Sequence, residues 1–131
     1  MSRITDFLNE AGVFYLATVD ENGQPKVRPL GAHIEADGKV MFGVGEFKDV
    51  YRQLRAEPRT EIAACGNDGR WLRYTGKVVF ETGPKYAQQM IEEAHLETIY
   101  NEKTGNKLAV FHLEDARAVI ITVMGPGENI L

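Results

Sequence analysis

Serine and cysteine are almost absent from this 131-residue sequence, and each shortage excludes a class of protein. Cys65 is the only cysteine, so no disulfide can form within the chain, and a reducing compartment is expected. Ser2 is the only serine, so the chain lacks a Gly-x-Ser-x-Gly nucleophile elbow, and serine-hydrolase chemistry is excluded. The histidines His33, His95 and His112 stand far apart without a second ligand at metal-binding spacing, and no metal site is predicted.

An excess of positive charge and long apolar runs are also missing. The 15 basic and 19 acidic residues give a formal charge of -4. A surface that binds nucleic acid or an anionic membrane needs a net basic face, so neither partner is predicted. No stretch reaches the length of a membrane span, and residues 1–6 do not resemble a signal peptide, so a cytoplasmic protein is expected. The length is that of one domain, spanning residues 1–131.

Runs of β-branched and aromatic residues alternate with turn dipeptides, a pattern typical of antiparallel hairpins. The expected strands cover residues 13–19, 24–34, 39–44, 60–65, 71–80, 108–113 and 116–123. Gly76 predicts a bulge or bend within the fifth of these strands. Pro29 lacks a backbone donor, so its strand should lie at an edge or open toward a ligand or a second subunit. The apolar run from Val119 to Val123 predicts burial on both faces.

Three short helices complete the expected fold. They cover residues 5–11, with Thr5 as the N-cap, then residues 47–57, and a third stretch from Gly83-Pro84 to about Tyr100. About seven strands and three short helices predict a mainly β fold, in which a small antiparallel sheet closes into a barrel. An open sandwich is the alternative.

Two stretches could bind a ligand. In the first, Val27 to Ala32, Arg28 lies among small and apolar residues. In the second, the strand residues Phe42 to Gly45 lead into a helix start at Lys48. Free N–H groups and a lysine at that point favour an anion such as phosphate. The alternative is that the two glycines permit a sharp turn and that Lys48 is a surface charge.

A ligand-binding role and a purely structural role also remain open for Arg28, Trp71 and Arg73. Arg28 either points into water or points with Lys39 or Lys48 toward an anionic ligand. Trp71 and Arg73 share one face of their strand and could cover a planar ligand, or form a half-buried tryptophan with an arginine at its rim. Cys65 lies in an apolar strand and is interpreted as a packing residue. With neither a protein nucleophile nor a metal cluster, reactivity would come from a bound organic cofactor.

The order of these features resembles the pyridoxamine-5′-phosphate-oxidase-like family of FMN-binding split barrels. The resemblance covers nearly the whole chain. It is carried by Phe14–Asp20, Gly23–Pro25, Val27–Leu30, Val40–Gly43, Lys48 with Val50–Leu54, Glu57–Arg59, Trp71–Arg73 and Gly76–Val78. The ordered set is specific to the superfamily, but it does not specify the reaction.

This resemblance implies an FMN-binding homodimer in which each flavin lies between two subunits. It places Arg28, Pro29 and Leu30 along the isoalloxazine ring, and Lys48 at the phosphate. The loop Phe42, Gly43, Val44 and Gly45 would approach the ribityl chain, whereas Trp71 and Arg73 would come from the second subunit.

The resemblance also has two departures. The family often carries Ser or Thr before the lysine, where this chain has none, so backbone N–H groups would replace the hydroxyls. The chain lacks the C-terminal substrate segment of the oxidases, so oxidation of pyridoxamine phosphate is not transferred to it. The hypothesis is a small FMN-dependent oxidoreductase that uses small-molecule electron donors and acceptors, with no catalytic residue assigned. The alternative is a non-catalytic carrier or sensor of flavin, haem or a deazaflavin.

Overall fold

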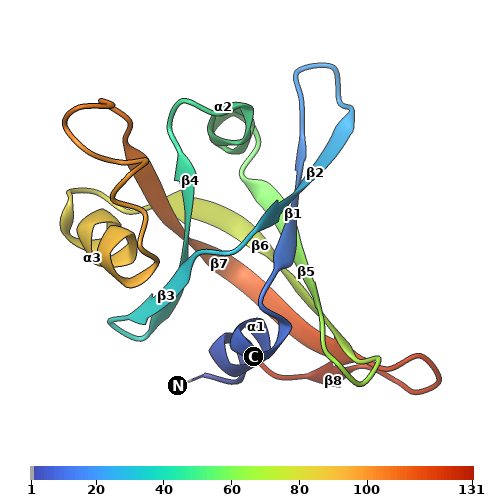
Figure 1. Cartoon of the computed structure of the whole chain (residues 1–131). Helices are drawn as coiled ribbons and strands as arrows, with labels where there is room; N and C mark the ends of the chain where they lie inside the picture. The colour runs from blue at the N-terminus through green and yellow to red at the C-terminus, as the bar shows by residue number, and fades with distance from the viewer. Residues whose placement is uncertain (1) are drawn as a thin grey trace.

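One antiparallel sheet dominates the computed structural model, which describes residues 2–131 (Figure 1). Its strands are β1 (Phe14–Val19), β2 (Pro25–Leu30), β3 (His33–Ala36), β4 (Lys39–Gly45), β5 (Arg59–Cys65), β6 (Trp71–Phe80), β7 (Leu108–Ile121) and β8 (Glu128–Asn129). The helices are α1 (Arg3–Ala11), α2 (Asp49–Ala56) and α3 (Lys85–Glu93). The strand order is β2-β1-β5-β6-β7-β4-β3, and β8 pairs with β7 outside this path.

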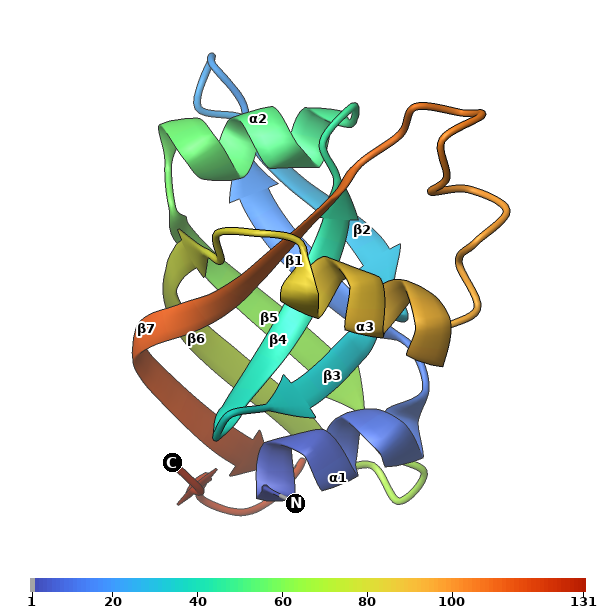
Figure 2. The ribbon, with the colours of Figure 1, turned by 90° about the vertical axis from the view of Figure 1, so that its left-hand side faces the viewer.

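The sheet curls so that its two edge strands are joined by only two residues, Gly31 and Ala32. Helix α2 lies across one end of the curled sheet and α1 across the other, while α3 lies on the side of β3 and β4 (Figure 2). The predicted mainly β fold, a small antiparallel split barrel, is confirmed. One continuous sheet replaces the two facing sheets that a sandwich would need. No helix within residues 2–131 has both the length and the apolar character needed to cross a membrane.

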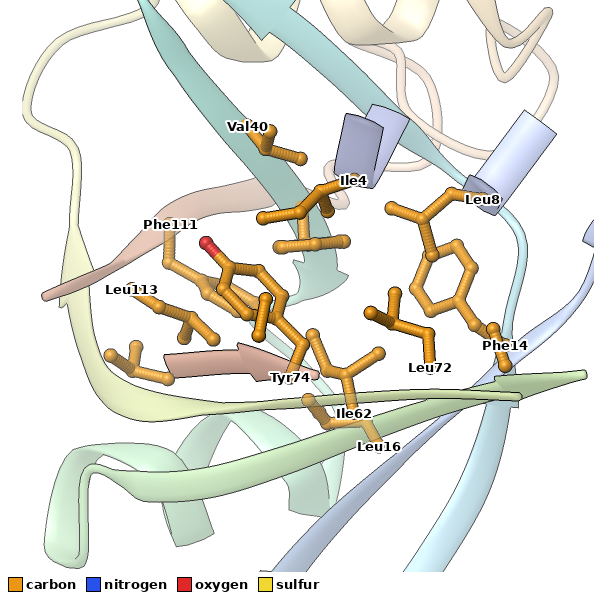
Figure 3. Packing of buried hydrophobic residues seen from close by; sticks show 14 of the residues in the cluster. Ile4, Leu8, Phe14, Leu16, Val40, Ile62, Leu72, Tyr74, Phe111 and Leu113 are labelled. Atoms are coloured by element: carbon orange, nitrogen blue, oxygen red, sulfur yellow. The ribbon is translucent and has the colours of Figure 1, made fainter. Parts of the chain in front are cut away.

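The interior of the curl is filled by side chains from alternate strand positions (Figure 3). On β1, Phe14 and Leu16 are fully buried, whereas Tyr15 between them is exposed. Phe42 lies at the centre, with its ring centroid 5.4 Å from that of Phe14 and 5.7 Å from that of Phe111. Full burial of a phenylalanine side chain contributes about 1.5–3 kcal/mol, so this aromatic row is a main source of stability.

The first helix begins earlier than predicted. Ser2 is the N-cap, and its Oγ accepts a hydrogen bond from the Thr5 backbone N–H at 3.1 Å. Thr5 is buried inside the first turn, and its hydroxyl donates to Glu35 Oε1 at 2.6 Å. The prediction that Thr5 is the cap was wrong because the only serine of the chain occupies that position.

The predicted strand 24–34 is two strands. β2 pairs with β1, and after Gly31 the chain crosses to the opposite edge, where β3 pairs with β4. The prediction that Pro29 lies at a sheet edge is confirmed, because within the described residues β2 has β1 as its sole neighbour. The missing N–H of Pro29 therefore interrupts no central ladder.

Conversely, the two predicted strands 108–113 and 116–123 form the single long strand β7. The register between β6 and β7 shifts between Thr75 and Lys77, which confirms the bulge predicted at Gly76. A Cβ at Gly76 would lie 3.0 Å from the Glu114 carbonyl oxygen, so the bulge favours glycine at this position. The prediction of burial on both faces for Val119–Val123 was wrong, because Ile120 is buried but Val123 is 81% exposed.

Helix α3 ends at Glu93, well before the predicted Tyr100. His95 has a φ of 56°, a left-handed conformation that does not continue a helix. Residues 97–106 form a loop that is stabilised by hydrogen bonds between its own residues. The Thr104 hydroxyl donates to the Ile99 carbonyl at 2.8 Å, and the Asn106 side chain donates to the same carbonyl at 3.1 Å.

Candidate functional site

Lys48 is the N-cap residue of α2, at the point where the chain leaves β4. Its side chain is exposed, and its Nζ lies 5.8 Å from the centroid of the Phe47 ring. Within the described residues Lys48 makes no ion pair, and its side chain does not cap the helix. The first N–H groups of a helix lack internal partners and carry partial positive charge. The arrangement therefore suits an anion.

The two glycines before Lys48 are explained by packing. Neither Gly43 nor Gly45 has a positive φ, so no turn geometry requires them. A Cβ on Gly43 would lie 2.5 Å from Met90 Sδ, and one on Gly45 would lie 2.7 Å from the Phe47 ring. The glycines therefore make room for α3 and for Phe47.

The other two residues of the predicted ribityl loop face the core. Phe42 is fully buried and Val44 is nearly so, both within the main apolar cluster. The side chains of these two residues are therefore not available to a ligand.

Arg28 points inward and joins three elements. Its Nη1 donates to the Leu16 carbonyl at 3.2 Å and to Thr18 Oγ1 at 2.8 Å, both on β1. Its Nη2 donates to Gln53 Oε1 on α2 at 2.9 Å, and the Thr18 hydroxyl donates to the same oxygen at 2.5 Å. Burial lowers the pKa of Arg28, while the nearby Asp49 carboxylate raises it.

This network fixes α2 against the β1–β2 hairpin. Lys48 begins α2 and Gln53 lies in its second turn, so the network also sets the position of Lys48. Lys39, the other proposed neighbour of Arg28, instead pairs with Glu81 at 3.6 Å. Leu30, on the same inward side as Arg28, packs against the core.

Trp71 and Arg73 lie together on the outer face of β6. The Arg73 guanidinium carbon lies 4.9 Å from the centroid of the Trp71 ring, and its Nε lies 3.2 Å from Glu61 Oε2. Trp71 is half-buried and Arg73 is exposed. Strands β1 and β5 separate β6 from β2, so one chain does not bring this pair to Arg28 and Lys48.

The same outer face carries exposed apolar groups. Pro29 pairs with Tyr15 across β2 and β1, and Val27 pairs with Ala17 in the same ladder. Tyr15 is 45% exposed and Val27 is 68% exposed. Cys65, expected to be a packing residue, is exposed at the end of β5, directly opposite Trp71.

Sequence reasoning missed Thr18 and Gln53, which complete the Arg28 network. A signal for Thr18 was present, because it continues the inward positions of Phe14 and Leu16 yet is polar. A buried hydroxyl at such a position requires a partner. Nothing local marks Gln53, since only the docking of α2 brings it to β1.

The family model for pyridoxamine 5′-phosphate oxidase matches residues 2–121. The chain belongs to the pyridoxamine 5′-phosphate oxidase family. A NimC/NimA family protein from Clostridium acetobutylicum is similar over the whole fold, with 32% identity, a TM-score of 0.87, and coverage of 98% of this chain and 89% of that one. A search of curated proteins finds no match.

More distant structures share the split-barrel fold of this family. An FMN-binding protein related to pyridoxamine 5′-phosphate oxidase from Nostoc punctiforme is 15% identical, with a TM-score of 0.63 and coverage of 96% of this chain and 86% of that one. A haem-binding protein from Mycobacterium smegmatis is 18% identical, with a TM-score of 0.69 and coverage of 94% and 54%. At these identities the likeness extends to the fold alone.

Proposed function

We propose that the chain is an FMN-binding protein that acts as a small flavin-dependent oxidoreductase. Membership of the family supports the proposal, as does the FMN-binding member of the same fold. FMN, when bound, accepts and donates hydride or single electrons. The residues of the chain have the simpler tasks of binding the cofactor and orienting it.

The observation that carries the proposal is the free cation at the start of α2. Lys48 is exposed at a helix N-terminus that no side chain caps. A phosphate dianion bound at the N-terminus of α2 would interact both with the free N–H groups of the first turn and with the Lys48 ammonium group. The nearby acidic residue Glu46 lines a hollow beside α3, and Lys48 does not line that hollow.

The proposal includes a homodimer with FMN between its subunits. The outer face of β2 and β1, with Tyr15, Val27 and Pro29, is apolar and exposed, and a second copy would cover it. A two-fold arrangement would let Trp71 and Arg73 of one subunit approach the Lys48 region of the other. One chain alone does not achieve this, because strands β1 and β5 intervene.

In this arrangement the chain has four roles. Lys48 and the N-terminus of α2 bind the phosphate, and the exposed edge of β2 at Pro29 lies along the ring. Arg28 holds α2 in place through Gln53. The positive charge of the partner's Arg73 would stabilise the anionic form of the reduced flavin.

The test is the visible absorption spectrum of the purified protein, followed by titration with FMN. We expect the two absorption bands of oxidised flavin, and a dissociation constant that rises at least about tenfold in Lys48→Ala, a loss of about 1.4 kcal/mol. Lys103→Ala, in the exposed loop after α3, is the matched control and should bind as the wild type does. A protein that binds no flavin, or a Lys48→Ala variant with unchanged affinity, would contradict the proposal.

A second candidate is a non-catalytic carrier or sensor of flavin, haem or a deazaflavin. A haem-binding protein among the structural neighbours supports a carrier, whereas the neighbour described as an F420 reductase supports only a change of cofactor. Stopped-flow reduction by NADH and NADPH, followed by a screen of acceptors, separates the two. Rapid turnover supports the oxidoreductase, whereas a cofactor that binds but never turns over supports the carrier. An intense Soret band in place of the flavin bands identifies haem.

A further inference from the structure

A shallow cavity of about 600 Å³, widely open to solvent, lies between α3 and the loop that follows it. Its walls include Glu46, Ala87, Ile91, Tyr100, Lys107 and Leu108. A second hollow of about 360 Å³ continues from it under the start of α3 and shares Glu46, Ala87 and Leu108. In Figure 1 this region lies at the left, where α3 and the loop flank β4. Volumes of this size are typical of small-molecule sites.

The exposed surface of the cavity is mostly apolar, and Tyr100 is its aromatic residue. Tyr100 lines the cavity, and its ring centroid lies 6.3 Å from that of Phe47, which is outside the lining. Tyr51 and Phe80 form an edge-to-face pair at 5.1 Å, and both line the second hollow. Aromatic faces and edges of this kind favour a flat ring over an aliphatic chain.

The charges of the cavity disfavour an anion. Two carboxylates, Glu46 and Glu102, line it against one ammonium group, that of Lys107. In the second hollow Arg55 is balanced by Glu81. The excess of carboxylates therefore disfavours a negatively charged ligand, in contrast to the cationic start of α2.

The cavity is preformed by hydrogen bonds within its own wall. Asn101 Nδ2 donates to the Glu97 carbonyl at 2.7 Å, and the Thr104 backbone N–H donates to Asn101 Oδ1 at 2.9 Å. The other wall, α3, is attached through Lys85 and Tyr86, which both contact the Asp37 carboxylate. A preformed wall lowers the ordering cost of binding.

We propose that this cavity binds a flat aromatic molecule that is uncharged or cationic. The connection between β4 and α2 places Glu46 on the cavity wall two residues before Lys48, so the cavity adjoins the proposed phosphate site. On the proposed function, the molecule bound there is the electron acceptor; the binding itself does not rest on the proposed function. The charge pattern also distinguishes the ligand from a phosphate-bearing substrate such as the one in the family name.

The experiment uses three two-ring probes of equal size, 2-naphthol, N-methylquinolinium and 2-naphthoate, with charges of zero, plus one and minus one. Each is titrated into the 15N-labelled full chain, with and without FMN, and amide shifts are followed. We expect saturable shifts at Ala87, Ile91, Tyr100 and Leu108 for the neutral and cationic probes. 2-Naphthoate should bind at least about tenfold more weakly, a difference of about 1.4 kcal/mol.

Two variants locate the site and its charge. Ala87→Leu places extra volume between the two hollows and should abolish the shifts, whereas Glu92→Leu, on the exposed side of α3, should preserve them. Glu46→Gln should narrow the preference for the cation over the anion, whereas Glu21→Gln, in the β1–β2 turn, should leave it unchanged. Thermal melting verifies that each variant is folded.

No saturable shift at the cavity for any probe, or equal binding of the anion, would overturn the inference. So would a folded Ala87→Leu variant that still binds. Probe binding without flavin binding would overturn the proposed function alone, because the cavity residues do not include Lys48.

Discussion

Arg28 on β2 and Gln53 on α2 are joined by a 2.9 Å hydrogen bond that connects an edge strand to the helix beginning at Lys48. Because Thr18 donates to the same Gln53 oxygen, the helix is tied to both strands of the hairpin. The network accounts for an arginine on an inward position of a strand. It also makes Arg28 a positioning residue for Lys48 rather than a free cation.

Gln53→Leu should destabilise the protein by about 1–2 kcal/mol, because the Arg28 guanidinium and the Thr18 hydroxyl lose a shared acceptor. Urea denaturation measures the loss. Gln89→Leu, whose amide donates an exposed hydrogen bond to Glu93 on α3, is the control and should change stability little. FMN affinity should also fall in Gln53→Leu, although Lys48 is intact. Unchanged stability would show that the network does not hold α2.

Gly43→Ala should destabilise the protein by about 1–3 kcal/mol through overpacking, because the new Cβ would lie 2.5 Å from Met90 Sδ. Gly31→Ala is the matched control: no heavy atom lies within 4 Å of its Cβ position, so its stability should be unchanged or slightly higher. In the double variant with Met90→Ala, the combined loss should be smaller than the sum of the two single losses. Strict additivity would argue against the contact.

Glu35 should contribute to acid denaturation. Hydrogen bonds from Thr5 and Ser2 hold its pKa at about 2, against an ordinary value of 4.5. Because the folded-state pKa is the lower one, the carboxylate stabilises the fold above about pH 4.5, and this stabilisation is lost as the pH falls toward 2. The stability difference between wild type and Glu35→Gln should therefore shrink over that window. Urea midpoints between pH 7 and 2 measure it, with Glu21→Gln as the control.

Val27→Asp should dissociate the proposed homodimer, because it places a charge on an apolar outer face where Val27 is 68% exposed. Light scattering measures the mass, and we expect a dimer for the wild type and a folded monomer for the variant. Leu131→Asp, at the exposed C-terminal residue, should remain dimeric. A wild-type protein that is monomeric with full FMN occupancy would refute the shared site.

Local chemistry alone determined much of this protein. Alternating apolar residues and Asp-Gly-type turns specified hairpins, and the missing donor of Pro29 specified a sheet edge, because both effects act over a few residues. The shortage of serine and cysteine excluded whole classes of chemistry without any coordinates. The lysine at the start of α2 was visible for the same reason, since a helix start has a local signature.

The tertiary structure decided what depends on distant partners. Gly43 was interpreted as a turn residue in the sequence, but Met90, which lies more than forty residues away, explains it. Arg28 could face water or a ligand until the docking of α2 supplied Gln53. The crossing at Gly31 and the cavity under α3 likewise arise only when the sheet curls, because contacts between remote segments leave no periodic trace in the sequence.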